Sequence, residues 1–281
     1  MKFYLMTDYE GVAGVYTWEN RADASLENFE RRMRGRRLLA REVDACVDGL
    51  YKGGASEVIV NDGHGAGYTI DLDLLDDRPL IVHGTGRPFW LPYLDASCAA
   101  TGLLGGHAKS HTPNANLAHS MDIGIAYEIN GVSVGEAGLQ AAIAGHFGVP
   151  FVLVCGDAHL CKEMEALIPG VVTAAVKCGI GETGAVTMPP QEAHELIRER
   201  TAEAVQRIGT VKPFTFGGAV HLIETRDEPA FDEWNPPPHS RVIDSRTREI
   251  EAEDIIDLVN KLYGYDPQWQ APSYEALRRG S

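Results

Sequence analysis

The chain has 281 residues, enough for one large domain, or for one large and one small domain, with a hydrophobic core. Its 40 Asp and Glu residues outnumber 25 Lys and Arg residues, and this net charge of -15 excludes the basic surface that nucleic acid or an anionic membrane requires. No apolar run reaches the roughly 20 residues of a membrane span, and the N-terminal apolar segment is too short for a signal peptide, so we expect a cytoplasmic protein.

The N-terminal part of the chain predicts a strand, a helix and a second strand. An apolar strand over residues 2–6 ends in the polar segment 7–11, and apolar residues at helical spacing predict a helix over 25–51. The next apolar run, 58–60, leads directly into the polar segment 61–64. A βαβ unit of this size indicates a parallel sheet.

Strands and helices continue to alternate along the chain to about residue 210. Helices are predicted over 136–147, from 157 to about 167, and over 190–208. Further strands are predicted over 80–83, 102–107, 132–134, 150–154 and 171–176. The predicted fold class is therefore α/β, with a mostly parallel central sheet flanked by helices.

The composition changes after residue 213. We expect a strand over 219–225, a strand or hairpin over 241–250, and a helix over 253–262. The chain is accordingly divided into an α/β domain, residues 1–210, and a smaller C-terminal α+β section with a tail, residues 211–281.

Ionisable side chains gather at the ends of the predicted strands, where open parallel sheets bind their ligands. A lone carboxylate there is more often a helix cap or turn residue, and a lone histidine is more often structural. Here, however, several strand ends carry such groups, and the strand ends of one sheet can meet in space. The groups are Asp8 and Glu10 after the first strand, Asp62 and His64 after the second, His107 after a later one, and Glu136 after another short strand, where a helix begins.

Imidazole and carboxylate together suit zinc, and the absence of paired cysteines favours a catalytic over a structural site. Three carboxylates exceed the needs of one zinc, whereas two metals about 3.5–4 Å apart would use them all. The His-rich segment 107–121 either lines this site or forms a surface loop, and composition favours the two equally. If it lines the site, His119 and Lys109 are candidates to supply a proton or polarise an oxyanion.

The order of several motifs resembles the D-aminopeptidase family of zinc metallopeptidases, typified by the enzyme of a bacterial dipeptide-transport operon. The resemblance covers residues 1–213 well and the C-terminal section only in outline. Its pieces are Thr7-Asp8-Tyr9-Glu10-Gly11-Val12-Ala13-Gly14, the segment 57–64, Gly106-His107-Ala108-Lys109, Thr112-Pro113, His119-Ser120-Met121, Val134-Gly135-Glu136-Ala137-Gly138-Leu139, and several shorter matches up to Lys177.

The resemblance implies a zinc aminopeptidase that holds two Zn²⁺ per chain. Its substrates would be short peptides, including D-amino-acid peptides such as D-Ala-D-Ala, and it would assemble into a ring-stacked homodecamer. Residue by residue, the resemblance makes Asp8 the bridge between the metals and His119 the catalytic histidine. It assigns Glu10 and His107 to one zinc, and His64 and Glu136 to the other.

The chain departs from the family pattern between His107 and His119, which lie one residue further apart, and Lys109 replaces an Arg. These changes bear on pocket shape more than on the metals. Two alternative functions also fit the donors: another two-metal hydrolase, such as an amidase or phosphoesterase, and a non-catalytic metal-dependent binding assembly. The choice between D- and L-peptides stays open, because a few pocket contacts set it.

Overall fold

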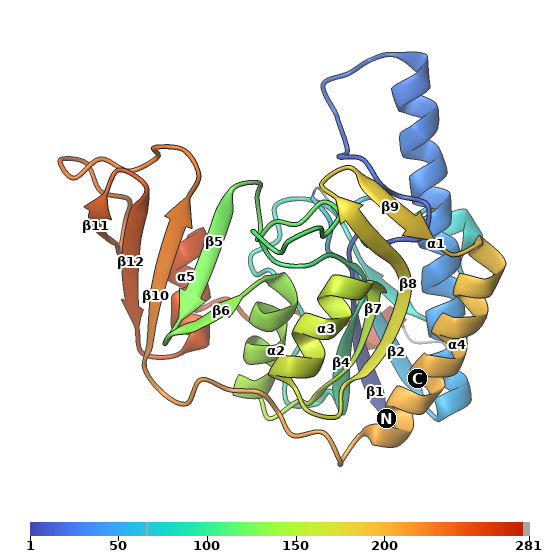
Figure 1. Cartoon of the computed structure of the whole chain (residues 1–281). Helices are drawn as coiled ribbons and strands as arrows, with labels where there is room; N and C mark the ends of the chain where they lie inside the picture. Colours follow the sequence, from blue (N-terminus) through green and yellow to red (C-terminus); the bar gives the residue numbers. More distant parts are fainter. Residues whose placement is uncertain (66, 278–281) are drawn as a thin grey trace.

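The computed structural model describes residues 1–65 and 67–277 and contains two β-sheets (Figure 1). The central sheet has the strand order β3-β2-β1-β4-β7-β8-β9, and only the β8–β9 pair is antiparallel. Its strands are β1 (Lys2–Thr7), β2 (Glu57–Asp62), β3 (Leu80–Val82), β4 (Ala100–Gly106), β7 (Phe151–Asp157), β8 (Val172–Gly181) and β9 (Gly184–Thr187). The predicted α/β class with a mostly parallel central sheet is confirmed.

Helices cover both faces of the central sheet. α1 (Leu26–Gly53) packs with α4 (Pro190–Arg207) on one face, and α2 (Glu136–His146) packs with α3 (Ala158–Leu167) on the other (Figure 1). Of two single-turn helices, η1 (Leu72–Leu74) lies between β2 and β3, and η2 (Glu275–Leu277) lies in the C-terminal tail after α5. None of the helices in the described part of the chain is long and apolar enough to cross a membrane.

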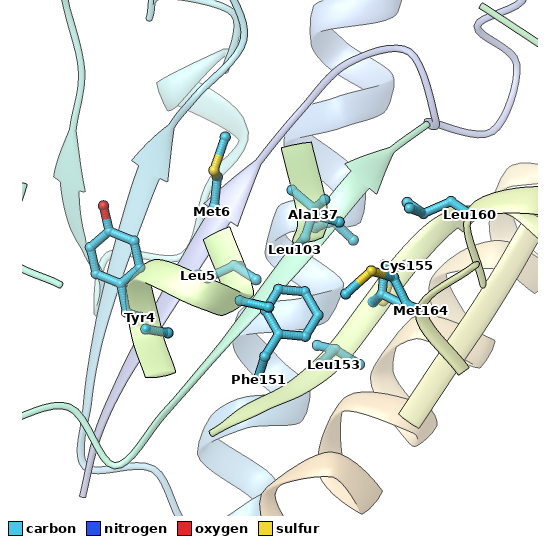
Figure 2. Close-up of a cluster of buried hydrophobic side chains, with 14 of the residues drawn as sticks. Tyr4, Leu5, Met6, Leu103, Ala137, Phe151, Leu153, Cys155, Leu160 and Met164 are labelled. Atoms are coloured by element: carbon cyan, nitrogen blue, oxygen red, sulfur yellow. The ribbon is translucent and has the colours of Figure 1, made fainter. Parts of the chain in front are cut away.

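The core lies between the central sheet and its helices. Fully buried side chains of β4 and β7, among them Leu103 and Phe151, meet Ala137 of α2 and Met164 of α3 (Figure 2). Burial of this kind stabilises a fold by about 25 cal/mol per Å² of apolar surface. The central strands are buried on both faces, which explains why they appear in the sequence as continuous apolar runs.

The second sheet is antiparallel, with the order β11-β12-β10-β5-β6, and it contacts α5 (Ile255–Tyr263). Its strands are β5 (Ile125–Ile129), β6 (Val132–Val134), β10 (Val220–Arg226), β11 (Arg241–Asp244) and β12 (Thr247–Ala252). The division of the chain near residue 210 stays a prediction; this sheet takes two strands from the segment before that boundary and three from the segment after it.

One expectation about the strands was wrong. The strand at 132–134 continues the β-strand alternation in the sequence, but it pairs with β5 in the second sheet rather than with the central sheet. The cause is the turn between them. Asn130 and Gly131 both have positive φ, 49° and 80°, as a two-residue hairpin turn requires, and the turn folds β6 back onto β5.

The strand order of the central sheet places the ends of β2, β1 and β4 side by side. Thr7 at the end of β1 is level with Asp62 of β2 and with Leu104 of β4. The loops after these three strands therefore start together. They also lie in close contact, because a Cβ on Gly11 would come 1.8 Å from the carbonyl oxygen of Gly106, so only glycine allows this approach.

Glu42 of α1 is buried behind the loop after β1 and accepts a hydrogen bond from the Ala13 N–H at 2.8 Å. Burial raises the pKa of Glu42 to about 8, although the Ala13 hydrogen bond and the charge of Lys177 oppose the shift. Between about pH 5 and pH 8 the folded chain keeps a proton that the unfolded chain loses. Stability therefore falls as pH rises through this window, by at most about 1.4 kcal/mol per pH unit.

The Glu42→Gln variant tests this assignment. Glutamine keeps the acceptor for Ala13 and cannot ionise, so we expect the thermal midpoint of the wild type, relative to that of Glu42→Gln, to fall steadily from pH 5 to pH 8. A constant difference between the two midpoints across this range would show that Glu42 does not titrate there.

Candidate metal centre

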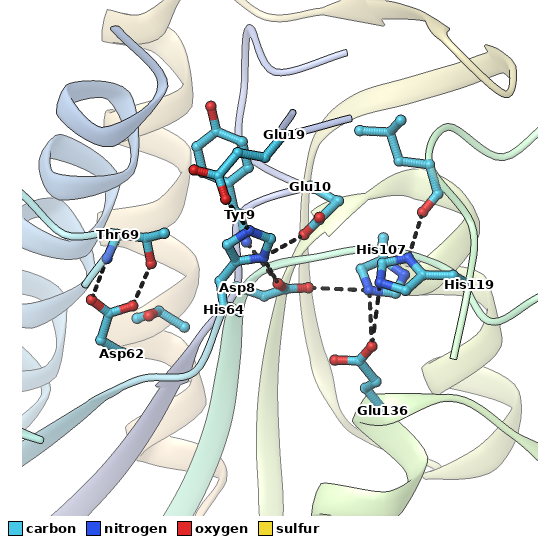
Figure 3. A network of polar contacts seen from close by, with 12 residues as sticks. Asp8, Tyr9, Glu10, Glu19, Asp62, His64, Thr69, His107, His119 and Glu136 are labelled. Atoms are coloured by element: carbon cyan, nitrogen blue, oxygen red, sulfur yellow. Dashed lines mark hydrogen bonds and ion pairs between the residues drawn. The ribbon is translucent and has the colours of Figure 1, made fainter. Parts of the chain in front are cut away.

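Asp8 stands at the middle of a buried polar cluster at the ends of the central strands. Its Oδ1 lies 3.3 Å from Nδ1 of His64, and its Oδ2 lies 3.3 Å from Nε2 of His107 (Figure 3). The carboxylate is fixed from behind, because the Tyr9 N–H donates to Oδ1 at 2.8 Å and the Asp8 N–H donates to the Leu104 carbonyl at 2.8 Å. Asp8 therefore presents one oxygen to each of two histidines.

The remaining predicted ligands complete a group on either side of Asp8. Glu10 Oε2 lies 3.0 Å from His64 Nδ1, and Glu136 Oε1 lies 3.4 Å from His107 Nε2. Within each of two groups, ligand atoms lie no more than 4.8 Å apart; the groups are Asp8, Glu10 and His64, and His107, His119 and Glu136. All six residues singled out as metal ligands or catalytic are thus brought together.

Four of the five carboxylate and imidazole ligand candidates come from the strand ends that the sequence predicted. Asp8 and Glu10 follow β1, His64 follows β2, and His107 follows β4. Glu136 reaches the cluster by another route, since it is the first residue of α2 and follows β6 of the second sheet. Its position was predicted correctly, but from a strand assigned to the wrong sheet.

His119 lies over His107, with ring centroids 3.8 Å apart and planes 11° from parallel. Its Nδ1 is 2.9 Å from the carbonyl oxygen of Leu117, so this nitrogen carries the proton and donates it to the hydrogen bond. The opposite nitrogen, Nε2, lies 3.6 Å from Glu136 Oε1 and is left free to accept a proton. The edge of Trp18 closes the outer side, with ring centroids 5.2 Å apart.

In the cluster, buried carboxylates and imidazoles lie close together and shift each other's pKa values. Burial by itself would raise the pKa of Asp8, but the charge on His107 and the hydrogen bond from His64 hold that pKa well below its usual value. Burial opposes the charged form of His107, yet Asp8 and Glu136 raise its pKa to about 10. The pKa of His64 is likewise raised against burial, chiefly by Glu10. The buried carboxylates therefore stabilise positive charge at this site, whether it is carried by protonated histidines or by a bound cation.

The donor set fits a metal cation. Glu10 Oε2 and His107 Nε2 are both buried and make no aligned hydrogen bond to any described residue, even though ionic partners lie close. Buried polar atoms without a partner are costly, and a carboxylate oxygen and an imidazole nitrogen are both zinc donors. A bound cation would use both lone pairs and take the place of the proton that a charged His107 carries on Nε2.

Three other polar residues, one at a predicted strand end and two in the His-rich segment 107–121, lie away from the cluster. Asp62 points from the end of β2 toward the following loop and accepts hydrogen bonds from Thr69 and from the Ile70 N–H, so it is a turn residue (Figure 3). Lys109 donates from Nζ to the Ser133 carbonyl. His111 pairs with Asp227 at an exposed position. The proposed proton-supplying role of Lys109 therefore has no geometric support.

Glu19 belongs to the site, and sequence reasoning missed it. Its Oε2 lies 3.4 Å from Nε2 of His64, the ring nitrogen that faces away from Asp8 and Glu10. Glu19 is itself held by Arg21 at 2.7 Å and by Arg32 at 3.0 Å. A carboxylate on the second ring nitrogen fixes the tautomer and orientation of a metal-binding histidine. The sequence carries no motif for this contact.

A Glu19→Gln variant should bind zinc about 10- to 100-fold more weakly than the wild type, because the carboxylate no longer orients His64. Competition with a fluorescent zinc chelator measures the change. Glu27→Gln is a matched control on the exposed start of α1, where Glu27 pairs with Arg31. Equal zinc affinity in Glu19→Gln and Glu27→Gln would rule out the orienting role.

A cavity of about 360 Å³ opens beside the cluster. Its lining includes Asp8, His64, His119 and Glu136, together with the aromatic side chains of Phe89, Trp90 and Tyr265. The volume is at the small end of ligand pockets. Buried histidine and carboxylate donors at the strand ends of an α/β sheet, next to such a cavity, are the arrangement of a metal-dependent hydrolase.

Comparison with known proteins agrees with this class. The sequence profile of the D-aminopeptidase family matches residues 1–263. The chain therefore belongs to the D-aminopeptidase family, and the family predicted from the sequence motifs is confirmed.

Two relatives show how far the similarity extends. A D-aminopeptidase of Bacillus subtilis (strain 168) is 36% identical over 217 residues, which cover 76% of this chain and 77% of the relative. The solved structure of the Zn-dependent D-aminopeptidase DppA from Bacillus subtilis, described as a self-compartmentalizing protease, superposes with a TM-score of 0.85 at 30% identity, covering 93% of this chain and 95% of that one.

Proposed function

We propose that the chain is a binuclear zinc aminopeptidase that hydrolyses the N-terminal amide bond of short peptides, D-amino-acid peptides among them. The observation that carries the proposal is the position of Asp8, whose two carboxylate oxygens face two separate groups of donors. The zinc dependence printed for the related Bacillus subtilis structure supports the choice of metal.

Asp8, Glu10, His64, His107 and Glu136 would hold the two zinc ions, with Asp8 shared between them. The resemblance pairs Glu10 with His107, whereas the distances in this structure pair Glu10 with His64. Both divisions leave Asp8 as the bridge. When bound, a zinc pair supplies Lewis acidity toward the scissile carbonyl and lowers the pKa of a coordinated water.

His119 would move the proton during hydrolysis. Its Nδ1–H is committed to the Leu117 carbonyl, so Nε2, on the side of Glu136, is the atom that accepts a proton and later donates it to the leaving amine. Trp18 and the stacked ring of His107 restrict the His119 ring to one orientation and exclude water from two of its sides.

We also propose that the chain assembles into a homodecamer and that it is a cytoplasmic protein. Apolar side chains are exposed on the projecting N-terminal part of α1 and on the β8–β9 hairpin, where Phe29 is 57% and Val186 is 64% exposed (Figure 1). Such surfaces suit association of this chain with further copies, in line with a homodecamer. All five cysteines are free thiols, as suits the reducing cytoplasm.

Metal analysis combined with a release assay tests the function. We expect about two zinc ions per chain in the purified protein, and release of the N-terminal residue from dipeptides, with one enantiomer preferred. Turnover of a generic phosphate ester but of neither dipeptide would indicate a phosphoesterase. Retention of a dipeptide without turnover would indicate a binding assembly, and less than one metal per chain would contradict the binuclear site.

A further inference from the structure

Arg87 lies in the cavity beside the candidate metal centre. It is the only Lys or Arg among the described residues that line this cavity, which it shares with Asp8 and His64. The acidic and imidazole side chains of the cavity belong to the candidate metal centre, whereas Arg87 has no role in the function proposed above. A cationic group at a fixed place in a small pocket needs an anionic partner.

Two uncharged acceptors hold the guanidinium of Arg87 in place. Its Nη1 donates to the side-chain oxygen of Asn61 and, at 3.1 Å, to the carbonyl oxygen of Asp62. Asn61 is fully buried and is fixed in turn by a bond from its Nδ2 to the Trp90 carbonyl, at 3.3 Å. The local backbone leaves room for the side chain, since a Cβ on Gly67 would come within 3.2 Å of Nη2 of Arg87.

No carboxylate of the described residues lies within ion-pair distance of Arg87, which has only the two hydrogen bonds given above. The contrast with its neighbours is informative, because Arg21 and Arg32 are both paired with Glu19. Arg87 thus keeps unused N–H donors and an unneutralised charge inside the pocket. The planar guanidinium matches a carboxylate, which it can bind through two parallel hydrogen bonds.

We propose that Arg87 binds the C-terminal α-carboxylate of the peptide substrate. The inference rests on the proposed aminopeptidase function and narrows its substrate class to di- and tripeptides with a free carboxylate. Zinc donors and Arg87 line the same cavity of about 360 Å³, so a peptide whose scissile amide meets the metals has only a short length left before it reaches Arg87. A longer peptide would place its C-terminus outside this space.

The test compares a dipeptide of the chirality that the enzyme cleaves with the same dipeptide amidated at its C-terminus. For the wild type we expect kcat/KM to be about 10- to 100-fold higher for the free acid, since a hydrogen-bonded charge pair contributes that much. In Arg87→Gln the two kcat/KM values should become about equal, because kcat/KM falls for the free acid and stays unchanged for the amide. Arg87→Lys should restore part of the preference, because lysine keeps the charge without the two-pronged geometry.

Two controls separate the subsite from a structural effect. Zinc content should be the same in all variants, and Arg78→Gln, a substitution at a surface arginine paired with Asp76 and Asp48, should keep the wild-type preference. An equal loss on acid and amide in Arg87→Gln, or a wild type that cleaves both equally, would overturn the inference and leave the aminopeptidase function standing.

A binding measurement distinguishes failure of the two proposals. Calorimetry in the zinc-loaded His119→Ala background compares the acid and the amide without turnover. Tighter binding of the acid that disappears when Arg87→Gln is added supports the carboxylate subsite, even if the wild type cleaves neither peptide and the aminopeptidase function is wrong. Equal binding of acid and amide in this background overturns the subsite.

Discussion

Replacing Asp8 with alanine is expected to remove both zinc ions and to lower kcat/KM for dipeptide cleavage by about 10⁴-fold or more. The two Asp8 oxygens face different histidines, each at 3.3 Å, so neither donor group is complete without this side chain. Loss of Lewis acidity toward the carbonyl removes several kcal/mol of transition-state stabilisation, and each 1.36 kcal/mol is about tenfold in rate. Metal analysis after gel filtration, together with the release assay, measures both losses.

Glu10→Ala is the matched comparison for Asp8→Ala. Glu10 follows the same strand and is equally buried, but its carboxylate belongs to the donor group of Asp8 and His64 and not to that of His107, His119 and Glu136. We expect this variant to retain about one zinc per chain. Asp8→Asn controls for folding, because asparagine preserves the shape and can still accept the hydrogen bond from the Tyr9 N–H. Two zinc ions per chain in Asp8→Ala would show that Asp8 is not the bridge.

The strand ends were predictable because β-strands in a parallel sheet impose a simple geometry. An apolar run followed at once by acids or histidine marks the carboxyl end of a buried strand, and β1, β2 and β4 turned out to be neighbours. The same rule also selected Asp62, which instead closes a turn with Thr69. The rule predicts that a residue lies at the carboxyl end of a strand, but it does not predict the direction in which the side chain points.

The residues that sequence reasoning missed reach the site through loops. Glu19 is 45 residues from His64 in the chain, and Arg87 lies in the segment between β3 and β4, so no periodic pattern connects either residue with the cluster. The pairing of β5 with the C-terminal strand β10 was not predicted for a similar reason, since these two strands are more than 90 residues apart in the chain. Contacts of this kind depend on tertiary packing, which local propensity does not encode.

Replacing His119 with alanine should separate chemistry from metal binding. His119 is the one member of the cluster for which two roles fit its position, because Nε2 lies 3.6 Å from Glu136 and could serve either as a proton carrier or as a third donor beside His107. Its Nδ1–H is fixed on the Leu117 carbonyl, and Nε2 faces Glu136, one of the residues that would hold metal. A residue that transfers protons contributes about 10²- to 10⁴-fold to the rate.

We therefore expect His119→Ala to keep two zinc ions per chain and to lose about 10²- to 10⁴-fold in kcat, with a smaller change in KM. His111→Ala is a suitable control, because His111 lies in the same loop but pairs with Asp227 at the surface. Loss of one zinc from His119→Ala would make this histidine a ligand, and full turnover would remove it from the mechanism. Neither result would bear on the proposed bridging role of Asp8, since the distances from Asp8 to His64 and His107 do not involve His119.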